Sequence, residues 1–413
     1  MHFLYNIITY ILSSILKLLA VFNPKLKLFT QGRKHVFSEL EKHIKVSDKV
    51  IWIHCASLGE FEQGRPLIAD SKIKYPKHKI VLSFFSPSGY EVQKNYPLAD
   101  IVVYLPLDTP GNARKFVESV HPSVVLFVKY EFWPNYLSEL KKQNIPTLLV
   151  SGIFRENQLF FKFYGGWMQR KLNSFSHFFV QDENSRYLLN RIGFENVTIS
   201  GDTRFDRVYE ILKQDNNLDF VQAFVGDSYV LVAGSTWQED EDLLVNYIMS
   251  QMHSAEKIII APHNIKTEAL QLLKEKLGKK VVFYSEKDGK KLEDYQVLVV
   301  DTIGLLTKIY SYADVAYVGG GYTKSGIHNI LEPATFGIPI VIGPNFVKFK
   351  EAQDLVQLNG CTVTDDQKTL NKLLTELKED EALRLKKGAI SKNYIVSSIG
   401  ATQTISSYVA TVL

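Results

Sequence analysis

Short apolar runs alternate with longer amphipathic stretches from Lys49 onward, and this alternation constrains the fold more than any other feature of the chain. Such a pattern is typical of strands joined by helical crossovers. The runs are continuously apolar, which indicates parallel sheets covered on both faces. We expect strands at VIWIHC, KIVLSF, IVVYLP, VVLFV, TLLVSG, HFFVQ and VTISG in the first half, and at YVLVAGS, KIIIAP, KVVFYS, QVLVVD, VAYVGG and PIVIGP in the second.

A polar stretch between Arg207 and Asp227 separates these two sets of strands. A chain of 413 residues also suits two domains better than one. We therefore predict an α/β protein with two Rossmann-like doubly wound domains facing a central cleft. The expected boundaries are 25–210 for the first domain, 211–228 for a linker, 229–392 for the second domain, and 393–413 for a C-terminal helix that could pack back on the first domain.

The first 22 residues carry a single charge, Lys17, and are long enough to cross or lie along a bilayer. A basic flank follows, which the positive-inside rule keeps cytoplasmic and which attracts anionic headgroups. We expect residues 1–24 to be a retained membrane anchor or an embedded amphipathic helix. The alternative is a soluble helix packed on the body, whereas a cleaved signal peptide fits poorly because no basic region precedes the apolar run.

Composition excludes several classes of protein. The net charge of +4, from 48 basic and 44 acidic residues, is too small to indicate nucleic-acid binding over the whole surface. Only Cys55 and Cys361 are present, so neither a disulfide framework nor a cysteine-based zinc site is expected. The apolar content of 46% is that of a folded globular protein.

Two acids follow strands of the first domain. Glu60 lies at a helix start after VIWIHC, in the tight turn ASLGE, where a carboxylate can act as a general base. The alternative is an acid that merely caps the helix. Glu131 follows VVLFV among aromatic residues, where burial is costly without a partner. It is either a substrate ligand or an acid paired with Lys129 or Arg155 for structural reasons.

Polar residues near the linker and in the second domain are candidates for anion binding. Arg204 could hold a carboxylate or phosphate in a two-pronged contact, or instead pair with Asp202 or Asp206. The turn of Gly234, Ser235 and Thr236 offers amides and hydroxyls to a phosphate at a helix start. The acids that follow, 239–242, are interpreted as a solvated helix face, and His263 ends the next strand at the cleft edge.

The stretch GGGYTKSGIHNILEPATFGIPIVIGPN, residues 319–345, has the layout of a nucleotide-binding corner. Consecutive glycines let backbone amides approach a ligand closely. His328 or Asn329 can cap a helix over residues 330–336, whose free amides would face a phosphate. Glu332, in the first turn, can accept hydrogen bonds from ribose hydroxyls. The alternative is an ordinary strand, loop and helix junction.

Taken in order, these motifs resemble the 3-deoxy-D-manno-octulosonic acid (Kdo) transferases, which have the glycosyltransferase-B architecture. The resemblance runs from the N-terminal helix to the region of Ala352, through ASLGE, SFFSPSGYE, YLPLD, YEFWPN, GDTRFD, GST, APHN, VDTIG, ADVAYVGG, HNILEPA and IGPN. It implies inverting, metal-independent transfer of Kdo from CMP-Kdo to a lipid A precursor at the cytoplasmic face of the cell inner membrane. No cofactor and no nucleic-acid partner are expected, since CMP-Kdo is a substrate.

The resemblance also implies roles for particular residues. The family's base falls on Glu60 and its second important acid on Glu131. We assign donor binding to Arg204, Gly234, Ser235, Thr236, His263, Gly320, Gly321, His328, Asn329 and Glu332, and acceptor binding to Ser57, Gly59, Ser86 and Ser88.

The chain departs from the family pattern at several positions. The usual arginine-histidine pair is His263 and Asn264 here, and GGHN has become GIHN with Ile327. Where the family usually has an acid after DTxG, this chain has Leu305. Where the family has a histidine after GP, it has Asn345. These changes bear on nucleotide contacts more than on the catalytic assignment. Two other functions stay open at this point: a nucleotide-sugar epimerase of the same two-domain shape, and a non-catalytic membrane-bound scaffold.

Overall fold

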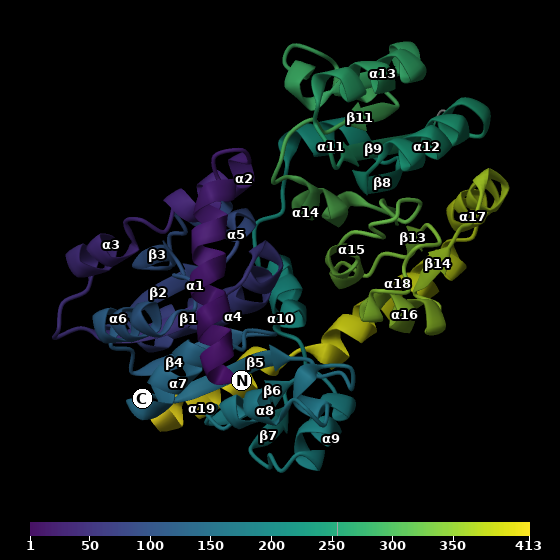
Figure 1. The fold of residues 1–413 in the computed structure, drawn as a ribbon. Helices are drawn as coiled ribbons and strands as arrows, with labels where there is room; N and C mark the ends of the chain where they lie inside the picture. Colours follow the sequence, from purple (N-terminus) through teal and green to yellow (C-terminus); the bar gives the residue numbers. More distant parts are fainter. Residues whose placement is uncertain (254) are drawn as a thin grey trace. The chain divides into compact units, whose positions relative to one another are not determined.

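A computed structural model describes residues 1–253 and 255–413 of the chain. The chain divides into two compact units (Figure 1). Unit 1 comprises Met1–Arg207 together with Ser398–Leu413, and unit 2 comprises Val208–Ser397. The stretch expected as a linker folds with unit 2, because it contains α11 (Asp219–Val225), whose Val221 and Phe224 are buried in the core of that unit.

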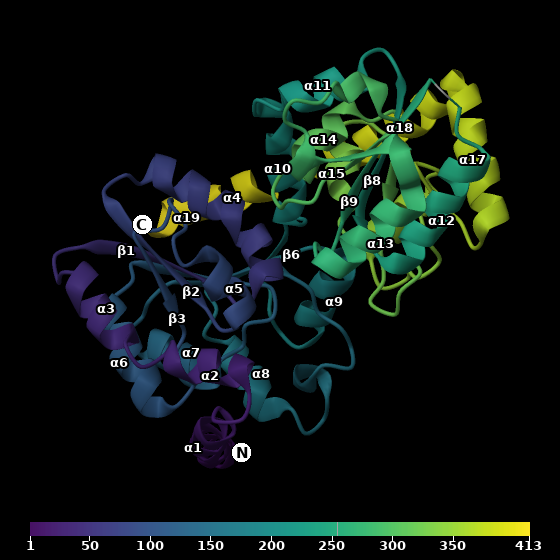
Figure 2. The same cartoon turned by 90° about the horizontal axis from the view of Figure 1, so that it is seen from above.

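Within the described part of unit 1, seven parallel strands form one sheet in the order β3-β2-β1-β4-β5-β6-β7. The strands are β1 (Lys49–Cys55), β2 (His78–Phe84), β3 (Ile101–Tyr104), β4 (Val124–Val128), β5 (Thr147–Gly152), β6 (His177–Val180) and β7 (Val197–Ile199). Helices α4 (Leu58–Lys74) and α19 (Ala401–Val412) lie on one face of this sheet, and α6 (Pro110–Val120) and α7 (Pro134–Lys142) on the other (Figure 2).

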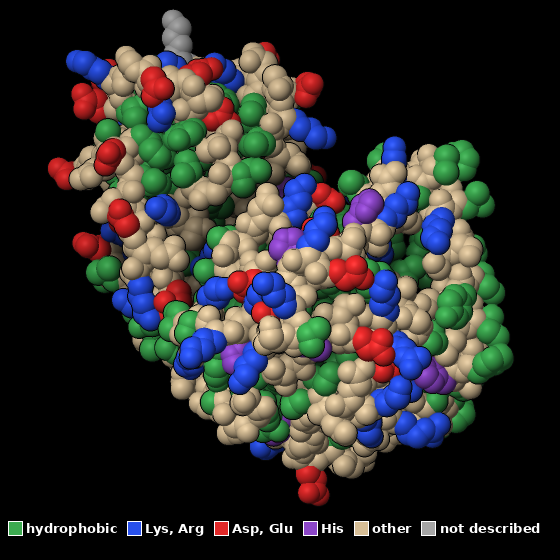
Figure 3. Space-filling view, turned by 90° about the vertical axis from the view of Figure 1, so that its left-hand side faces the viewer, with side chains coloured by type: hydrophobic (Ala, Val, Ile, Leu, Met, Phe, Trp, Pro, Cys, Tyr) green, Lys and Arg blue, Asp and Glu red, His purple; other side chains and the backbone are tan. Residues whose placement is uncertain are grey.

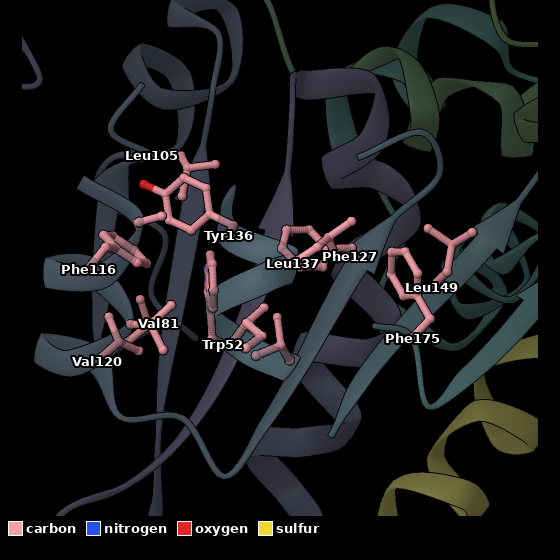
Figure 4. Packing of buried hydrophobic residues seen from close by; sticks show 14 of the residues in the cluster. Trp52, Val81, Leu105, Phe116, Val120, Phe127, Tyr136, Leu137, Leu149 and Phe175 are labelled. Atoms are coloured by element: carbon pink, nitrogen blue, oxygen red, sulfur yellow. The ribbon is translucent and has the colours of Figure 1, made fainter. Parts of the chain in front are cut away.

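The sheet of unit 1 separates two apolar cores, and β1 contributes to both. Trp52 points to the face of α6 and α7, where its ring centroid lies 4.9 Å from Phe116, 5.4 Å from Phe127 and 5.9 Å from Tyr136 (Figure 4). Its neighbour Ile53 points to the opposite face, toward α4 and α19. Burial on both faces explains why the strand is a continuous apolar run.

Unit 2 repeats this architecture. Its described residues form a second parallel sheet of seven strands, in the order β10-β11-β9-β8-β12-β13-β14. The strands are β8 (Tyr229–Thr236), β9 (Glu256–Pro262), β10 (Val281–Phe283), β11 (Val297–Val299), β12 (Val315–Val318), β13 (Ile340–Ile342) and β14 (Cys361–Val363). The prediction of two doubly wound parallel sheets is therefore confirmed. The sequence did not indicate β14, an edge strand of three residues.

The apolar N-terminal segment forms α1 (His2–Leu19), followed by α2 (Pro24–Gln31). Among the described helices, α1 is the one with the length and composition to cross a membrane, and none of its residues is buried. Polar side chains of α1 form hydrogen bonds to the rest of unit 1. The Tyr5 hydroxyl donates to Asp108 at 2.7 Å, His2 contacts Asn135 at 3.0 Å, and Asn135 donates to Asn6 at 3.0 Å.

The C-terminal segment is not one helix, as expected for 393–413, but two. Helix α18 (Glu381–Ser398) ends near Gly400, whose φ of 114° lies in a region that favours glycine, and α19 begins after it. Asp206 caps α19, since its carboxylate accepts the amides of Gly400 at 2.6 Å and Thr402 at 2.7 Å. Ile405 and Val409 of α19 are then buried in the core of unit 1, next to α4.

Asp206→Ala tests whether this cap holds α19 in place. Removing the acceptor leaves two helix-end amides without their partner, so we expect a loss of about 1 kcal/mol in the free energy of unfolding. Urea unfolding followed by tryptophan fluorescence measures it. Glu195→Ala, which removes an exposed acid of the same unit, is the control and should leave the midpoint unchanged. An equal midpoint for the two variants would contradict the capping role.

Candidate functional site

Both sheets reverse their strand order next to the first strand of the unit. In unit 1 the chain builds outward from β1 to β2 and β3 and then returns to add β4 on the other side of β1. In unit 2 the same reversal places β12 beside β8. Ligands of doubly wound sheets bind at the carboxyl ends of the strands where the order reverses. The segments that follow β1, β4, β8 and β12 are therefore the candidate site segments.

Glu60 lies in the first turn of α4, directly after β1, and its side chain is half-buried. The Ser57 hydroxyl donates a hydrogen bond to its Oε2. Glu131 accepts from His54 of β1, and Glu60 lies in the helix that begins directly after β1, so both acids lie near the end of this strand. Burial raises the pKa of the Cys55 thiol, and the carboxylates of Glu60 and Glu131 raise it further. The two acids predicted from separate motifs are thus brought together at the reversal between β1 and β4.

Glu131 is 8% exposed and belongs to a buried hydrogen-bond chain. Its Oε2 accepts from His54 Nε2 at 3.0 Å and from Trp133 Nε1 at 2.6 Å. On the other side of the ring, His54 Nδ1 lies 2.8 Å from Ser83 Oγ, which also accepts from Trp52 Nε1 at 2.8 Å. These hydrogen bonds fix the orientation of the carboxylate. The sequence had suggested Lys129 or Arg155 as its partner and did not indicate His54.

The residues assigned to acceptor binding lie on two adjacent loops. Ser86 caps α5 (Pro87–Gln93) by accepting the amide of Ser88 at 3.2 Å, and the two hydroxyls are 2.9 Å apart. The Ser86 amide donates to Ala56 at 2.7 Å, which joins this loop to the turn of Ser57 and Gly59. Gly59 and Ser88 are exposed. The four residues are therefore grouped at the same sheet edge as Glu60.

Arg204 lies in α10 (Thr203–Tyr209), and its guanidinium pairs with an acid. Nε donates to Asp202 at 2.9 Å, and Nη2 lies 2.8 Å from the same carboxylate oxygen. Asp202 is 5% exposed and also accepts from Gln63 at 3.0 Å. The sequence left open a two-pronged contact with a ligand or a pairing with a neighbouring acid, and the structure shows the pairing with Asp202. The Nε and Nη2 edge of the guanidinium is therefore occupied within the protein.

Gly234, Ser235 and Thr236, predicted as a turn, are the last residues of β8, where the pairing with β9 is irregular. Of these three residues, Ser235 is the one that is not buried. Gly234 is packed so closely against Tyr310 that a side chain would collide with the phenol. Thr236 is 1% exposed, and its hydroxyl donates to Glu241 at 3.0 Å. Ser235 is half-exposed and has a φ of 55°, which is uncommon for a residue with a side chain. Backbone strain of this kind is concentrated at ligand sites.

The glycines after β12 are explained by packing within the protein. A side chain on Gly320 would meet the Gly326 carbonyl, and one on Gly321 would meet the backbone of Gly343. The Gly320 amide donates to Asp240 at 2.8 Å. This amide is therefore engaged within the protein, and donor binding by Gly320 stays a prediction.

Asp240 ties the end of β12 to the start of α12 (Gln238–Ser250). Its carboxylate accepts from the amides of Gly320 and Trp237, both at 2.8 Å, and from the Tyr317 hydroxyl at 2.7 Å. Burial raises its pKa, and these three hydrogen bonds oppose the shift. Asp240 and Glu241 are both buried, so interpreting residues 239–242 as a solvated helix face was wrong for these two acids.

His263 and His328, predicted from separate motifs, are brought together by Trp237. His263 is stacked 4.7 Å from Trp237 and 4.3 Å from His328, measured between ring centroids. Trp237 Nε1 donates to His328 Nε2 at 2.9 Å. Burial, and then the neighbouring His263, lower the pKa of His328 to about 4, so the ring is neutral near pH 7. Trp237 was not among the predicted site residues.

The helix expected after Asn329 is shorter than predicted. It spans Leu331–Thr335, and Asn329 Oδ1 accepts the Leu331 amide at 3.1 Å. Glu332 accepts from Asn329 at 3.1 Å and from Thr307 at 2.8 Å, which fixes both carboxylate oxygens. Thr307 was not predicted either. In the described residues, no three His, Cys, Asp or Glu side chains are grouped so as to hold a metal ion.

Glu241→Gln tests the buried acid next to Thr236. Burial raises the pKa of Glu241 to about 7, although the Thr236 hydroxyl opposes the shift. The folded protein therefore retains this proton more tightly than the unfolded chain does, and stability is lost as pH rises from about 4.5 to above 7. As pH rises from 5 to 8, the free energy of unfolding of the variant, measured with urea, should increase by about 1–3 kcal/mol relative to that of the parent.

The conservative variant Glu239→Gln, at an exposed position of the same helix, is the control and should show no such gain. A parallel pH dependence for the parent and Glu241→Gln would contradict the assignment.

The chain is similar to known proteins over most of its length. Residues 30–207, which include Glu60 and Glu131, match the sequence family described as 3-deoxy-D-manno-octulosonic-acid transferase (kdotransferase). A 3-deoxy-D-manno-octulosonic acid transferase of Aquifex aeolicus is 25% identical over 344 residues, 82% of this chain and 88% of the relative. One of Chlamydia muridarum is 27% identical over 356 residues, 84% of this chain and 82% of the relative.

Solved structures share the fold at low sequence identity. The UDP-GlcNAc 2-epimerase of Neisseria meningitidis, bound to UDP-GlcNAc, aligns with a TM-score of 0.62 and 13% identity over 88% of this chain and all of that one. MurG of Acinetobacter baumannii aligns with a TM-score of 0.53 and 12% identity over 87% of this chain and 98% of that one. At these identities the likeness concerns the architecture and not the reaction.

Proposed function

Since the chain belongs to the family of 3-deoxy-D-manno-octulosonic acid transferases, we propose that it moves Kdo from CMP-Kdo to a lipid A precursor in lipopolysaccharide biosynthesis. The observation that carries the proposal is the position of Glu60. It is a half-buried carboxylate at the strand-order reversal of unit 1, inside the segment that matches the family.

Glu60 is the proposed general base. A sugar hydroxyl of the acceptor attacks the anomeric carbon of Kdo, its proton passes to Glu60, and the bond to the phosphate of CMP breaks on the opposite face. The anomeric configuration therefore inverts. The hydroxyl of Ser57 donates to Oε2, which leaves Oε1 to take the proton. A positioned base of this kind contributes about 10²–10⁴-fold to the rate.

We propose that the buried Glu131 positions the loops of the acceptor site. Its burial and its two donors, His54 and Trp133, favour an orienting role over direct proton transfer. The Trp133 ring lies 4.5 Å from Phe85, which precedes Ser86. Through these contacts the carboxylate holds the two loops that carry Ser57, Gly59, Ser86 and Ser88.

The sugar nucleotide is proposed to bind at the carboxyl ends of β8 and β12. The side chains accessible there are Ser235, His263, His328, Asn329 and Glu332, which supply hydroxyl, imidazole, amide and carboxylate groups. The buried Gly234, Thr236, Gly320 and Gly321 give these turns their shape. Arg204 is proposed to act through Asp202, its partner, and not through a direct two-pronged contact.

Helix α1 is proposed to lie on the cytoplasmic leaflet of the inner membrane. Polar side chains of α1 are hydrogen-bonded to the rest of unit 1, whereas large apolar side chains such as Phe3, Ile8 and Ile11 are 52–78% exposed. Because α1 faces the viewer in Figure 1, it forms the right-hand edge of Figure 3, where hydrophobic side chains dominate. Docking along its length fits a helix embedded in the interface better than one that crosses the bilayer.

The basic flank is only partly available to lipid headgroups. Lys34 of this flank lines a pocket together with Lys17 of α1, and both can meet anionic groups. Arg33, in contrast, donates to the carbonyls of Leu105 at 2.9 Å and Phe85 at 2.6 Å. These hydrogen bonds give the arginine a structural role that the sequence did not indicate, and burial lowers its pKa to about 9.

Glu60→Gln tests the proposed base. The amide keeps the size of the side chain and can still accept from Ser57, so folding and CMP-Kdo binding should be retained while transfer falls at least about 100-fold. The assay follows labelled Kdo from CMP-Kdo to the lipid acceptor. Glu62→Gln is the control, at a position two residues further along the same helix. It removes an acid that pairs with Arg65 and Arg207, and its transfer rate should stay within about threefold of the parent's.

The same assay, run with and without acceptor, distinguishes the alternative functions. Label bound to lipid supports transfer. A free sugar product formed without lipid would instead identify an epimerase, and no consumption of CMP-Kdo would identify a scaffold. Nearly unchanged turnover by Glu60→Gln in an active parent would reject the role of Glu60 and leave the transferase assignment intact.

A triple variant, Ile8→Gln, Ile11→Gln and Ile15→Gln, tests membrane attachment. These positions share one exposed face of α1. Each substitution removes an apolar side chain whose burial in the membrane would contribute about 1.5 kcal/mol or more to the free energy of binding. We expect binding to anionic vesicles to fall at least tenfold in co-sedimentation, roughly the effect of losing 1.4 kcal/mol. Ile73→Gln, at an exposed site on α4, is the matched control. Undiminished binding by the triple variant would reject α1 as the attachment surface.

A further inference from the structure

Trp237 and His328 form an almost continuous flat surface at the edge of the unit 2 sheet. Their planes differ by 14° and their centroids are 6.3 Å apart, yet Nε1 of the indole lies 2.9 Å from Nε2 of the imidazole. Rings stacked face to face cannot bring two ring atoms so close, so these two rings meet edge to edge in a common plane. His263 lies over both.

This contact determines where the proton of His328 lies. An indole N–H only donates, so Nε2 of His328 must be the unprotonated acceptor, and the single proton of the neutral ring is placed on Nδ1. The pKa of His328, lowered to about 4 by burial and by His263, keeps the ring neutral. Within residues 1–253 and 255–413, Nδ1 has no hydrogen-bond partner. The protein thus holds a donor group that it does not use itself.

We propose that Trp237 is a positioning residue that fixes His328 in the Nδ1–H form, so that Nδ1 donates to an anionic oxygen of the sugar nucleotide. The inference rests on the proposed function and extends it to a residue that no motif indicated. His328 follows the glycines at the end of β12, and Trp237 directly follows β8, so the contact joins the two segments at the strand-order reversal.

Two other contacts keep the pair in this geometry. The Trp237 amide donates to buried Asp240, which fixes the backbone that carries the indole. The His328 amide donates to the Gly319 carbonyl at 3.1 Å, which fixes the backbone of the imidazole. Gly320 has a φ of 92°, and a side chain there would come within 3.1 Å of the His328 ring. The proton position is therefore set by the fold before any ligand arrives.

Trp237→Phe tests the proposal, because phenylalanine keeps an aromatic ring beneath His263 and removes only the donor. In protein labelled with ¹⁵N-histidine, with the His328 signals assigned by their loss in His328→Gln, the parent should show a protonated Nδ1 and an unprotonated Nε2. The variant should shift toward the Nε2–H form. The KM for CMP-Kdo should rise about tenfold or more, as expected for a misplaced hydrogen bond to a charged group, with a much smaller change in kcat.

Trp167→Phe, in unit 1, is the control for the substitution itself and should change neither the ¹⁵N signals of His328 nor the KM. Binding of CMP alone identifies the anionic oxygen. A weaker affinity of Trp237→Phe for CMP indicates the phosphate, whereas a loss confined to CMP-Kdo indicates the Kdo carboxylate.

A parent protein with Nε2 protonated would overturn the proposal, even if the variant failed to fold. So would a variant whose tautomer shifts while the KM and CMP affinity stay unchanged. These outcomes are distinct from failure of the proposed function, in which the parent consumes no CMP-Kdo although the ¹⁵N signals still report the Nδ1–H form.

Discussion

Parallel strand pairing is the constraint on which the rest of this structure depends. All strands of a parallel sheet end at the same edge, and a reversal of strand order leaves the segments after the two central strands side by side. In unit 1 this brings Glu60 and Glu131, 71 positions apart in the chain, to the end of β1. In unit 2 it brings Trp237 and His328 into one hydrogen bond. The chemistry of both edges follows from this backbone arrangement.

Polar groups buried behind each edge hold the site segments in place. In unit 1 a chain of donors and acceptors runs from Trp52 through Ser83 and His54 to Glu131. In unit 2 the carboxylate of Asp240 accepts two backbone amides and a phenol. An unpaired carboxylate at these depths would be costly, so each network is stable only when all its members are in place. Exposed groups such as Ser235 are thereby carried on rigid supports.

The sequence predicted the strands well because each is a continuous apolar run. It missed β14 because the polar Thr362 interrupts the run in Cys361–Val363. It predicted Glu60 from its place after such a run. It offered Asp202 as a partner of Arg204, two residues away, which the structure has. It could not predict the burial of Asp240, since that depends on contacts with Tyr317 and Gly320, far away in the chain. The glycines after β12 were recognised as special, but close packing explains them in part, and no local pattern distinguishes packing from ligand approach.

The return of the chain to unit 1 has a consequence for how the protein is made. Helix α19 supplies Ile405 and Val409 to a core that β1 and α4 began to build some 340 residues earlier. During synthesis, unit 2 emerges in full before that core can close. A nascent chain ending near Arg207 therefore exposes, on the ribosome, the part of this apolar sheet face that α19 later covers beside α4.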